Sequence, residues 1–128
     1  MKGPADEPAS EEHFRTLTKV SNSLENQFLD VLNNHGHRLP DEAQQIVDGY
    51  YVRPDFAYHV GGMDVAVFLD GPVHDDSYQK SKDERDGAKL VDEAGWLVLR
   101  FHYSDAEQGW LDTIAAHPDV FGIGKTKA

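Results

Sequence analysis

The sequence predicts an α/β domain in three layers, with a central mixed sheet flanked by helices. Apolar side chains recur with mostly helical spacing through the first third of the chain, which is typical of amphipathic helices. Two largely apolar runs, residues 65–69 and 96–101, favour buried strands. The order helix, hairpin, helix, strand, helix gives this layered arrangement.

The N-terminal helical region is expected to begin at Ser10 and to end at Gly36, a residue that favours helix termination. A break near residues 20–23 divides it into two helices. Asn22 and Glu25 stand three residues apart at the start of the second helix, which is the pattern of a capping box.

The middle of the chain predicts strands. Residues 46–52 are expected to form a strand region interrupted at Asp48 and Gly49. A hairpin follows, with strands at residues 55–60 and 63–70 and a turn at the pair Gly61-Gly62. The second of these strands is the most apolar segment of the chain, so we expect it at the centre of the sheet.

The C-terminal part predicts a helix, a strand and a helix. Residues 79–94 are expected to form a helix that ends at Gly95, and residues 96–101 a buried strand. A last helix is expected over residues 105–117, stopped by Pro118.

The chain of 128 residues is long enough for one core. We expect a tail or linker at residues 1–10, one domain at residues 11–120 and a C-terminal tail at residues 121–128. The sequence contains no cysteine, which excludes disulfides and thiolate metal sites and suits a reducing compartment, so we expect a cytoplasmic protein. No segment resembles a signal peptide or a membrane span.

The formal net charge of −11 opposes independent binding to DNA, because polyanion binding usually rests on lysine and arginine. Bound metal ions would offset part of this charge locally. Alternatively, the chain is a module of a larger protein whose other parts hold the substrate.

Acidic side chains and one histidine gather near predicted strand ends. Asp55 begins one strand, Asp70 ends the most apolar strand, and His74 follows shortly after it. Two carboxylates and an imidazole suit a divalent metal that activates water, with His74 transferring a proton. Each residue also has an ordinary interpretation, since aspartate is common in turns and loop histidines usually lie at the surface.

The remaining candidates are weaker. Glu25 is favoured as a helix cap, although an acid above the sheet can also hold a metal-bound water. Lys82, Arg85 and Lys89 share one helix face and could hold a phosphate backbone, but interleaved acids favour a solvated salt-bridged face. The sequence has no phosphate-binding glycine loop and no Gly-x-Ser-x-Gly motif.

Taken together, four segments resemble the restriction-endonuclease-like superfamily of PD-(D/E)xK nucleases, most closely its very-short-patch repair branch and small relatives. The resemblance covers roughly residues 20–105. The matching segments are Ser21-Asn22-Ser23-Leu24-Glu25-Asn26-Gln27-Phe28, Arg53-Pro54-Asp55-Phe56, Val67-Phe68-Leu69-Asp70-Gly71 with His74, and Asp83-Glu84-Arg85-Asp86, which continues to Gly95-Trp96-Leu97-Val98-Leu99-Arg100-Phe101.

The resemblance implies a restriction-endonuclease-like fold and a site that uses Mg²⁺, for which Mn²⁺ would substitute. Asp55 would be the metal-binding aspartate and the Leu69 carbonyl the second protein ligand. His74 would be the catalytic histidine, and Glu25 the acid that contacts metal-bound water. Asp70 stands where the repair branch has a histidine, and we include it among the candidate metal and catalytic residues.

The chain departs from the family pattern in its second strand. The usual acid-x-lysine is absent, because Phe68, Leu69 and Asp70 occupy its place. If a cation is still required there, the candidates are Lys80, Lys82 and Arg85 of the following helix. No cysteine or histidine set matches the structural zinc of the repair enzymes, so a mismatch-repair role does not carry over.

The leading hypothesis is therefore a Mg²⁺-dependent DNA endonuclease domain that works with a helicase-type domain or partner protein. The main alternative is a catalytically degenerate nuclease fold that binds nucleic acid or protein. A third interpretation is a metal-dependent hydrolase of another phosphoester. We expect no membrane partner.

Overall fold

The computed structural model describes residues 11–50, 52–71 and 77–123, with side chains described from residue 12 onward and not for residues 77–84. Their elements follow in the order α1, α2, β1, β2, β3, α3, β4, a 3-10 turn, α4 and α5. This order gives an α/β domain, as the sequence predicts. No helix in the described part is long and apolar enough to cross a membrane.

The sheet has four strands in the order β1-β2-β3-β4. β1 (Glu42–Ala43) pairs antiparallel with β2 (Phe56–Val60), which pairs antiparallel with β3 (Met63–Asp70). β3 and β4 (Leu97–His102) run parallel. The predicted mixed sheet is thus confirmed, and its most apolar strand, β3, lies between two neighbours.

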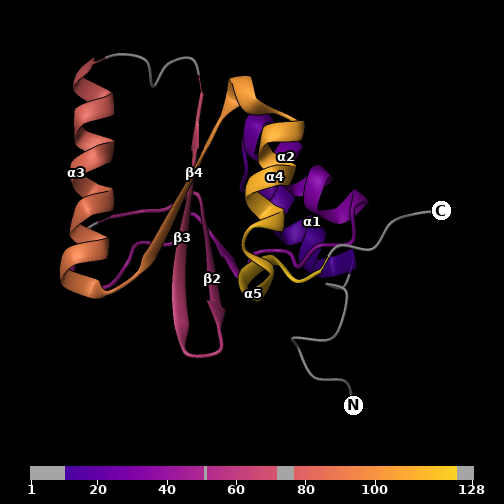
Figure 1. Ribbon diagram of the computed structural model, residues 1–128, viewed down its shortest axis with the longest axis horizontal. Helices are drawn as coiled ribbons and strands as arrows, with labels where there is room; N and C mark the ends of the chain where they lie inside the picture. Colours follow the sequence, from indigo (N-terminus) through magenta and orange to yellow (C-terminus); the bar gives the residue numbers. More distant parts are fainter. Residues whose placement is uncertain (1–10, 51, 72–76, 124–128) are drawn as a thin grey trace.

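Helices lie on both sides of this sheet (Figure 1). α3 (Ser77–Ala94) lies on one side. The helices on the other side are α1 (Glu11–Lys19), α2 (Ser23–Asn34), α4 (Gln108–Ala115) and α5 (Pro118–Phe121). The parallel pairing of β3 and β4 requires a crossover of this kind, and α3 supplies it.

The side chains of β3 alternate between two cores. Val65, Val67 and Leu69 belong to the larger core, which includes residues of α2, α4 and α5, whereas Ala66 and Phe68 belong to a smaller core with Leu90 of α3. Because successive residues of a strand point to opposite faces, only a continuous apolar run satisfies both cores. The expectation of burial on both faces is confirmed.

Three aromatic rings of the larger core pack around Phe28 of α2, which is fully buried. Its ring centroid lies 4.7 Å from that of Phe101, 5.6 Å from that of Trp110 and 5.9 Å from that of Phe56. These rings join a helix on one side of the sheet to β2, β4 and α4, so they fix how α2 lies over the strands.

Two local signals of the sequence are confirmed in atomic detail. The Asn22 side chain accepts from the Glu25 backbone N–H, and the Glu25 side chain accepts from the Asn22 backbone N–H, forming the expected capping box. Gly61 and Gly62 have φ angles of 57° and 79°, the left-handed values that a two-residue hairpin turn requires.

Other expectations are corrected. Residues 46–52 form no strand in the part described, but a turn with one isolated bridge between Val47 and Val52, and the edge strand lies earlier, at Glu42–Ala43. The short loop around Gly49 closes the chain on itself, so these residues cannot extend along β2. One isolated bridge is found where the sequence predicts an interrupted strand region.

The C-terminal helix is also shorter than expected. It spans Gln108–Ala115 after a 3-10 turn at Tyr103–Asp105. Pro118 begins a further short helix, because proline is well tolerated in a first helical turn. That helix carries Phe121, which is fully buried, so the core extends one residue into the segment expected to be a tail.

Candidate functional site

Asp55 is held at the end of the central strand. Its Oδ2 accepts a hydrogen bond of 2.7 Å from the backbone N–H of Leu69. The residue stands just before β2, whose first residue, Phe56, pairs with Val67 of β3. The antiparallel register therefore brings Asp55 level with the last residues of β3, and the structure unites two of the positions expected to form the site.

Gln44 connects Asp55 to Glu25. Its backbone N–H donates to the Asp55 carbonyl at 3.1 Å, and its side-chain amide donates to Glu25 Oε1 at 2.9 Å. Gln44 has a φ of 58°, the left-handed region that a residue with a side chain rarely adopts. The chain turns sharply here after β1, and this turn directs the Gln44 amide toward α2.

Glu25 is the one charged side chain that is buried among the described residues, with 5% of its surface exposed. Besides Gln44, its carboxylate accepts from the Asn22 N–H at 3.0 Å and from Asn22 Nδ2 at 3.2 Å. These donors compensate for the removal of the carboxylate from water. Glu25 is thus a helix cap, as its local sequence indicates, and it is also linked to the Asp55 segment through Gln44.

Asp70 faces a different partner. Its Oδ1 lies 3.6 Å from Arg100 Nη1, and the Arg100 guanidinium stacks over the Phe68 ring at 4.7 Å from the centroid. Phe68 pairs with Arg100 across β3 and β4, which places both on the α3 side of the sheet. A cation therefore does lie beside the acid at the end of β3, and it comes from the neighbouring strand.

α3 packs closely over this arginine at Gly87. A Cβ built at Gly87 would lie 2.8 Å from Arg100 Nη2. Any larger residue at that position must displace the guanidinium. Glycine at position 87 therefore allows α3 to pass close over the ion pair of Arg100 and Asp70.

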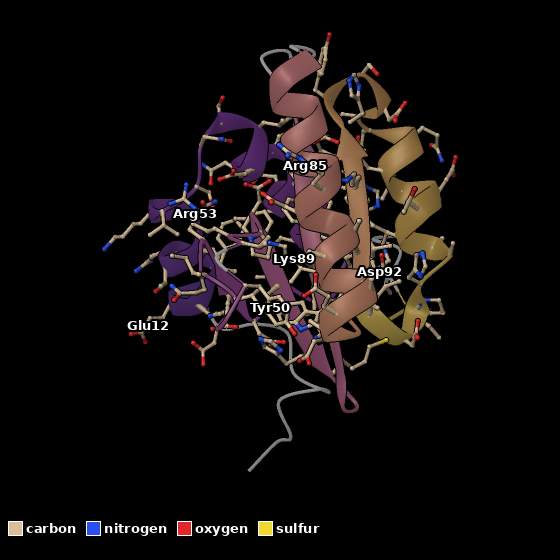
Figure 2. All side chains as sticks on the ribbon, turned by 90° about the vertical axis from the view of Figure 1, so that its left-hand side faces the viewer. Glu12, Tyr50, Arg53, Arg85, Lys89 and Asp92 are labelled. Carbon is tan, nitrogen blue, oxygen red and sulfur yellow. The ribbon has the colours of Figure 1, made fainter. Side chains whose placement is uncertain are left out.

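The remaining expected site residues either lie outside the described part or are exposed on α3. His74 lies outside the described residues, as do the side chains of Lys80 and Lys82. Arg85 and Lys89 are exposed on α3 (Figure 2). Arg85 is therefore not the cation beside Asp70.

Asp55 and the Leu69 carbonyl are oxygen donors of the kind that suits a hard cation, but they are too few to complete its coordination. Carboxylate and carbonyl oxygens are the ligands that Mg²⁺ prefers, and proteins often hold it through one or two carboxylates with several waters. Among the side chains that the structure describes, no three histidines, aspartates or glutamates are grouped as metal ligands. Asp55 and the Leu69 carbonyl are thus donors of the kind that Mg²⁺ takes, and water would have to complete the coordination of a cation held there.

Two residues of this region, Gln44 and Arg100, are not among the site residues that the sequence predicts. Gln44 acts through its backbone turn and its amide, and glutamine in a polar segment has no pattern that reveals this. Arg100 is a different case, because its place within an apolar strand is unusual. The sequence thus marks Arg100 as unusual, but the partner of Arg100 depends on the register between β3 and β4.

Comparisons of the chain with protein-family models, with curated proteins and with solved structures give no match.

Proposed function

We propose that this chain is a metal-dependent endonuclease domain of the restriction-endonuclease-like type that hydrolyses phosphodiester bonds in DNA. The observation that carries the proposal is the 2.7 Å hydrogen bond between Asp55 and the Leu69 N–H. It holds an acid at the end of the central strand of a mixed α/β sheet, which is where the resemblance requires the metal-binding aspartate.

In this proposal Asp55 and the Leu69 carbonyl hold Mg²⁺. The cation would supply a polarised water and would stabilise charge on the phosphate. Glu25, held by Asn22 and Gln44, would contact a metal-bound water, and the Gln44 N–H also donates a hydrogen bond to the Asp55 carbonyl. His74 stays the candidate for proton transfer on the basis of the sequence.

Arg100 has a positioning role in this scheme. Its guanidinium partly neutralises Asp70, so a cation at Asp70 would have to compete with it. We therefore assign Asp55 as the main metal ligand. The ion pair of Asp70 and Arg100 would contribute charge near the end of β3 without binding the metal directly. The net charge of −11 still favours a partner or neighbouring domain that holds most of the DNA.

The contrasting candidate is a degenerate nuclease fold that binds nucleic acid or protein without cutting. Two contacts favour it: Asp70 already faces Arg100, and both oxygens of Glu25 accept hydrogen bonds within the protein. Carboxylates engaged in this way resemble a structural polar network rather than an open metal site.

The test is cleavage of labelled single-stranded, duplex and branched DNA with Mg²⁺ or Mn²⁺. The informative variant is Asp55→Asn, because its amide oxygen can still accept from the Leu69 N–H while the negative charge is lost. We expect its cleavage to fall to the level without metal, with the melting temperature nearly unchanged. Asp92→Asn, the same substitution at an exposed position of α3, is the matched control and should cut like wild type.

Equal cleavage by wild type and Asp55→Asn would place any activity elsewhere. A well-folded wild type that binds neither metal and cuts no DNA, even with a helicase-type partner, would support the degenerate fold. Metal-dependent hydrolysis of a small phosphoester without DNA cleavage would support the third interpretation.

A further inference from the structure

A cleft of about 200 Å³ lies on the α3 side of the sheet, away from Asp55. We call it the Trp96 cleft. Its lining residues are Glu42, Gln45, Ile46, Val47, Asp48, Ala57, His59 and Trp96. This volume is smaller than the pockets that hold drug-sized ligands, and it suits one long side chain.

The cleft combines apolar walls with negative charge. Trp96 and Val47 provide apolar surface, and Ile46 at the cleft is 63% exposed, an unusual degree for isoleucine. Glu42 and Asp48 provide carboxylates, and none of the described residues that line the cleft is a lysine or an arginine. Asp48 has no ion-pair partner among the described residues.

His59 leaves this charge only partly compensated. Its two ring nitrogens lie 2.5 Å from Glu42 Oε1 and 2.7 Å from Asp64 Oδ1, so both contacts are hydrogen bonds when the ring is protonated. Even then, one imidazolium faces two carboxylates, and Asp48 adds a third negative group. The region around the cleft therefore carries net negative charge.

Two hydrogen bonds hold the segment that forms one wall of the cleft. The Val47 N–H donates to the Val52 carbonyl at 2.7 Å, and the Tyr50 hydroxyl donates to the Glu93 carbonyl of α3 at 3.2 Å. Figure 2 shows Tyr50 in front of the sheet, beside α3. A preformed wall lowers the entropic cost of binding.

We propose that the Trp96 cleft binds an arginine or lysine side chain that a partner protein presents next to an apolar residue. The apolar stem of such a side chain would lie against Val47, and its cationic head would meet the indole of Trp96 and the carboxylate of Asp48. The exposed Ile46 would contact the neighbouring apolar residue. The negative charge of the cleft favours a cationic occupant, and the same charge repels nucleic acid from this surface.

This proposal is independent of the proposed nuclease activity. None of Asp55, Glu25 and Asp70 lines the cleft. A chain with a formal net charge of −11 is complementary to a basic partner surface, and the Trp96 cleft is a place where one arginine or lysine would dock.

The test is a titration of the isotope-labelled chain with a capped Leu-Arg-Leu peptide, followed by nuclear magnetic resonance. The chain has two tryptophans, so the indole signal of Trp96 reports the cleft and that of buried Trp110 is an internal reference. We expect saturable shifts at Trp96 and not at Trp110, with a dissociation constant on the order of 1 mM.

Variants locate the binding. Asp48→Asn should weaken binding roughly threefold, as expected for loss of one exposed charge contact. Asp30→Asn makes the same charge change on the surface of α2, on the other side of the sheet, and should leave binding unchanged. Ile46→Ser should weaken binding of the peptide but not of acetyl-arginine amide, which lacks the leucines.

Three results would overturn the proposal. One is the absence of any Trp96 shift up to about 10 mM peptide, a concentration well above the expected dissociation constant. Another is equal binding of a capped Leu-Gln-Leu peptide, which would show that the cation is not recognised. The third is acetyl-arginine amide binding as tightly as the peptide, which would indicate a site for small cations.

Discussion

Replacing Glu25 tests whether the polar network between α2 and Asp55 is structural. Glu25 is 5% exposed, and three donors point at its carboxylate: the Asn22 N–H, Asn22 Nδ2 and Gln44 Nε2. Glu25→Ala removes half of the capping box and leaves these partly buried donors without their acceptor. The Asn22 side chain still caps the Glu25-position N–H, because that bond uses the backbone.

The expected magnitude follows from these contacts. Loss of a capping interaction costs about 1 kcal/mol, and each donor left without a partner costs about 1 kcal/mol when it is only partly buried. Removing the buried carboxylate recovers part of this loss of stability, because transferring a carboxylate out of water on folding is itself unfavourable. We therefore expect Glu25→Ala to lower the free energy of unfolding by about 2–3 kcal/mol.

Urea unfolding, followed by circular dichroism, measures this loss. With a denaturant slope of about 1–3 kcal/mol per molar urea, the midpoint should fall by roughly 0.7–3 M. A double-mutant cycle with Gln44→Ala isolates one contact and should give a coupling energy of about 1 kcal/mol. A Glu25→Ala protein within about 0.5 kcal/mol of wild type, or a coupling near zero, would refute the reasoning.

Two further predictions concern the other side of the sheet. Partial burial lowers the pKa of His59, but the hydrogen bonds and charges of Glu42 and Asp64 raise it more, so the folded-state pKa lies above its ordinary value. The stabilisation from His59 is then fully present below about pH 6.5 and is lost as the pH rises through the folded-state pKa. Over that pH range the free energy of unfolding of wild type should fall, whereas that of His59→Gln should not. A folded-state titration of the imidazole below about pH 6.5 would contradict this. Trp96→Ala should lower the free energy of unfolding by only about 1–2 kcal/mol because Trp96 is half-buried, whereas Phe28→Ala should lower it by about 3–5 kcal/mol. Equal urea midpoints for the two variants would contradict this difference in burial.

The smaller value for Trp96 corrects what the sequence favours. Its place in an apolar run predicts a fully buried strand residue. The strand begins one residue later, at Leu97, and the Trp96 ring meets the ring of His59 edge to face, with centroids 5.7 Å apart. The side chain therefore lies at the rim of the sheet and forms a wall of the Trp96 cleft.

The sequence alone determined the elements whose signals are local. The capping box of Asn22 and Glu25, the Gly61-Gly62 turn and the continuous apolar strand β3 each follow from residues that are close in the chain. Local hydrogen bonds, left-handed φ angles and side-chain periodicity act over a few residues, so no distant contact was needed to predict them.

The tertiary structure decided which distant residues meet. The partner of Asp55 is a backbone N–H of β3, the partner of Glu25 is Gln44, and the partner of Asp70 is Arg100. These contacts depend on strand register and on the angle at which α2 crosses the sheet, both fixed by the packing of the whole core. A shift of one residue in the pairing of β3 with β4 would move Arg100 to the other face, so its contact with Asp70 exists only once the sheet is assembled.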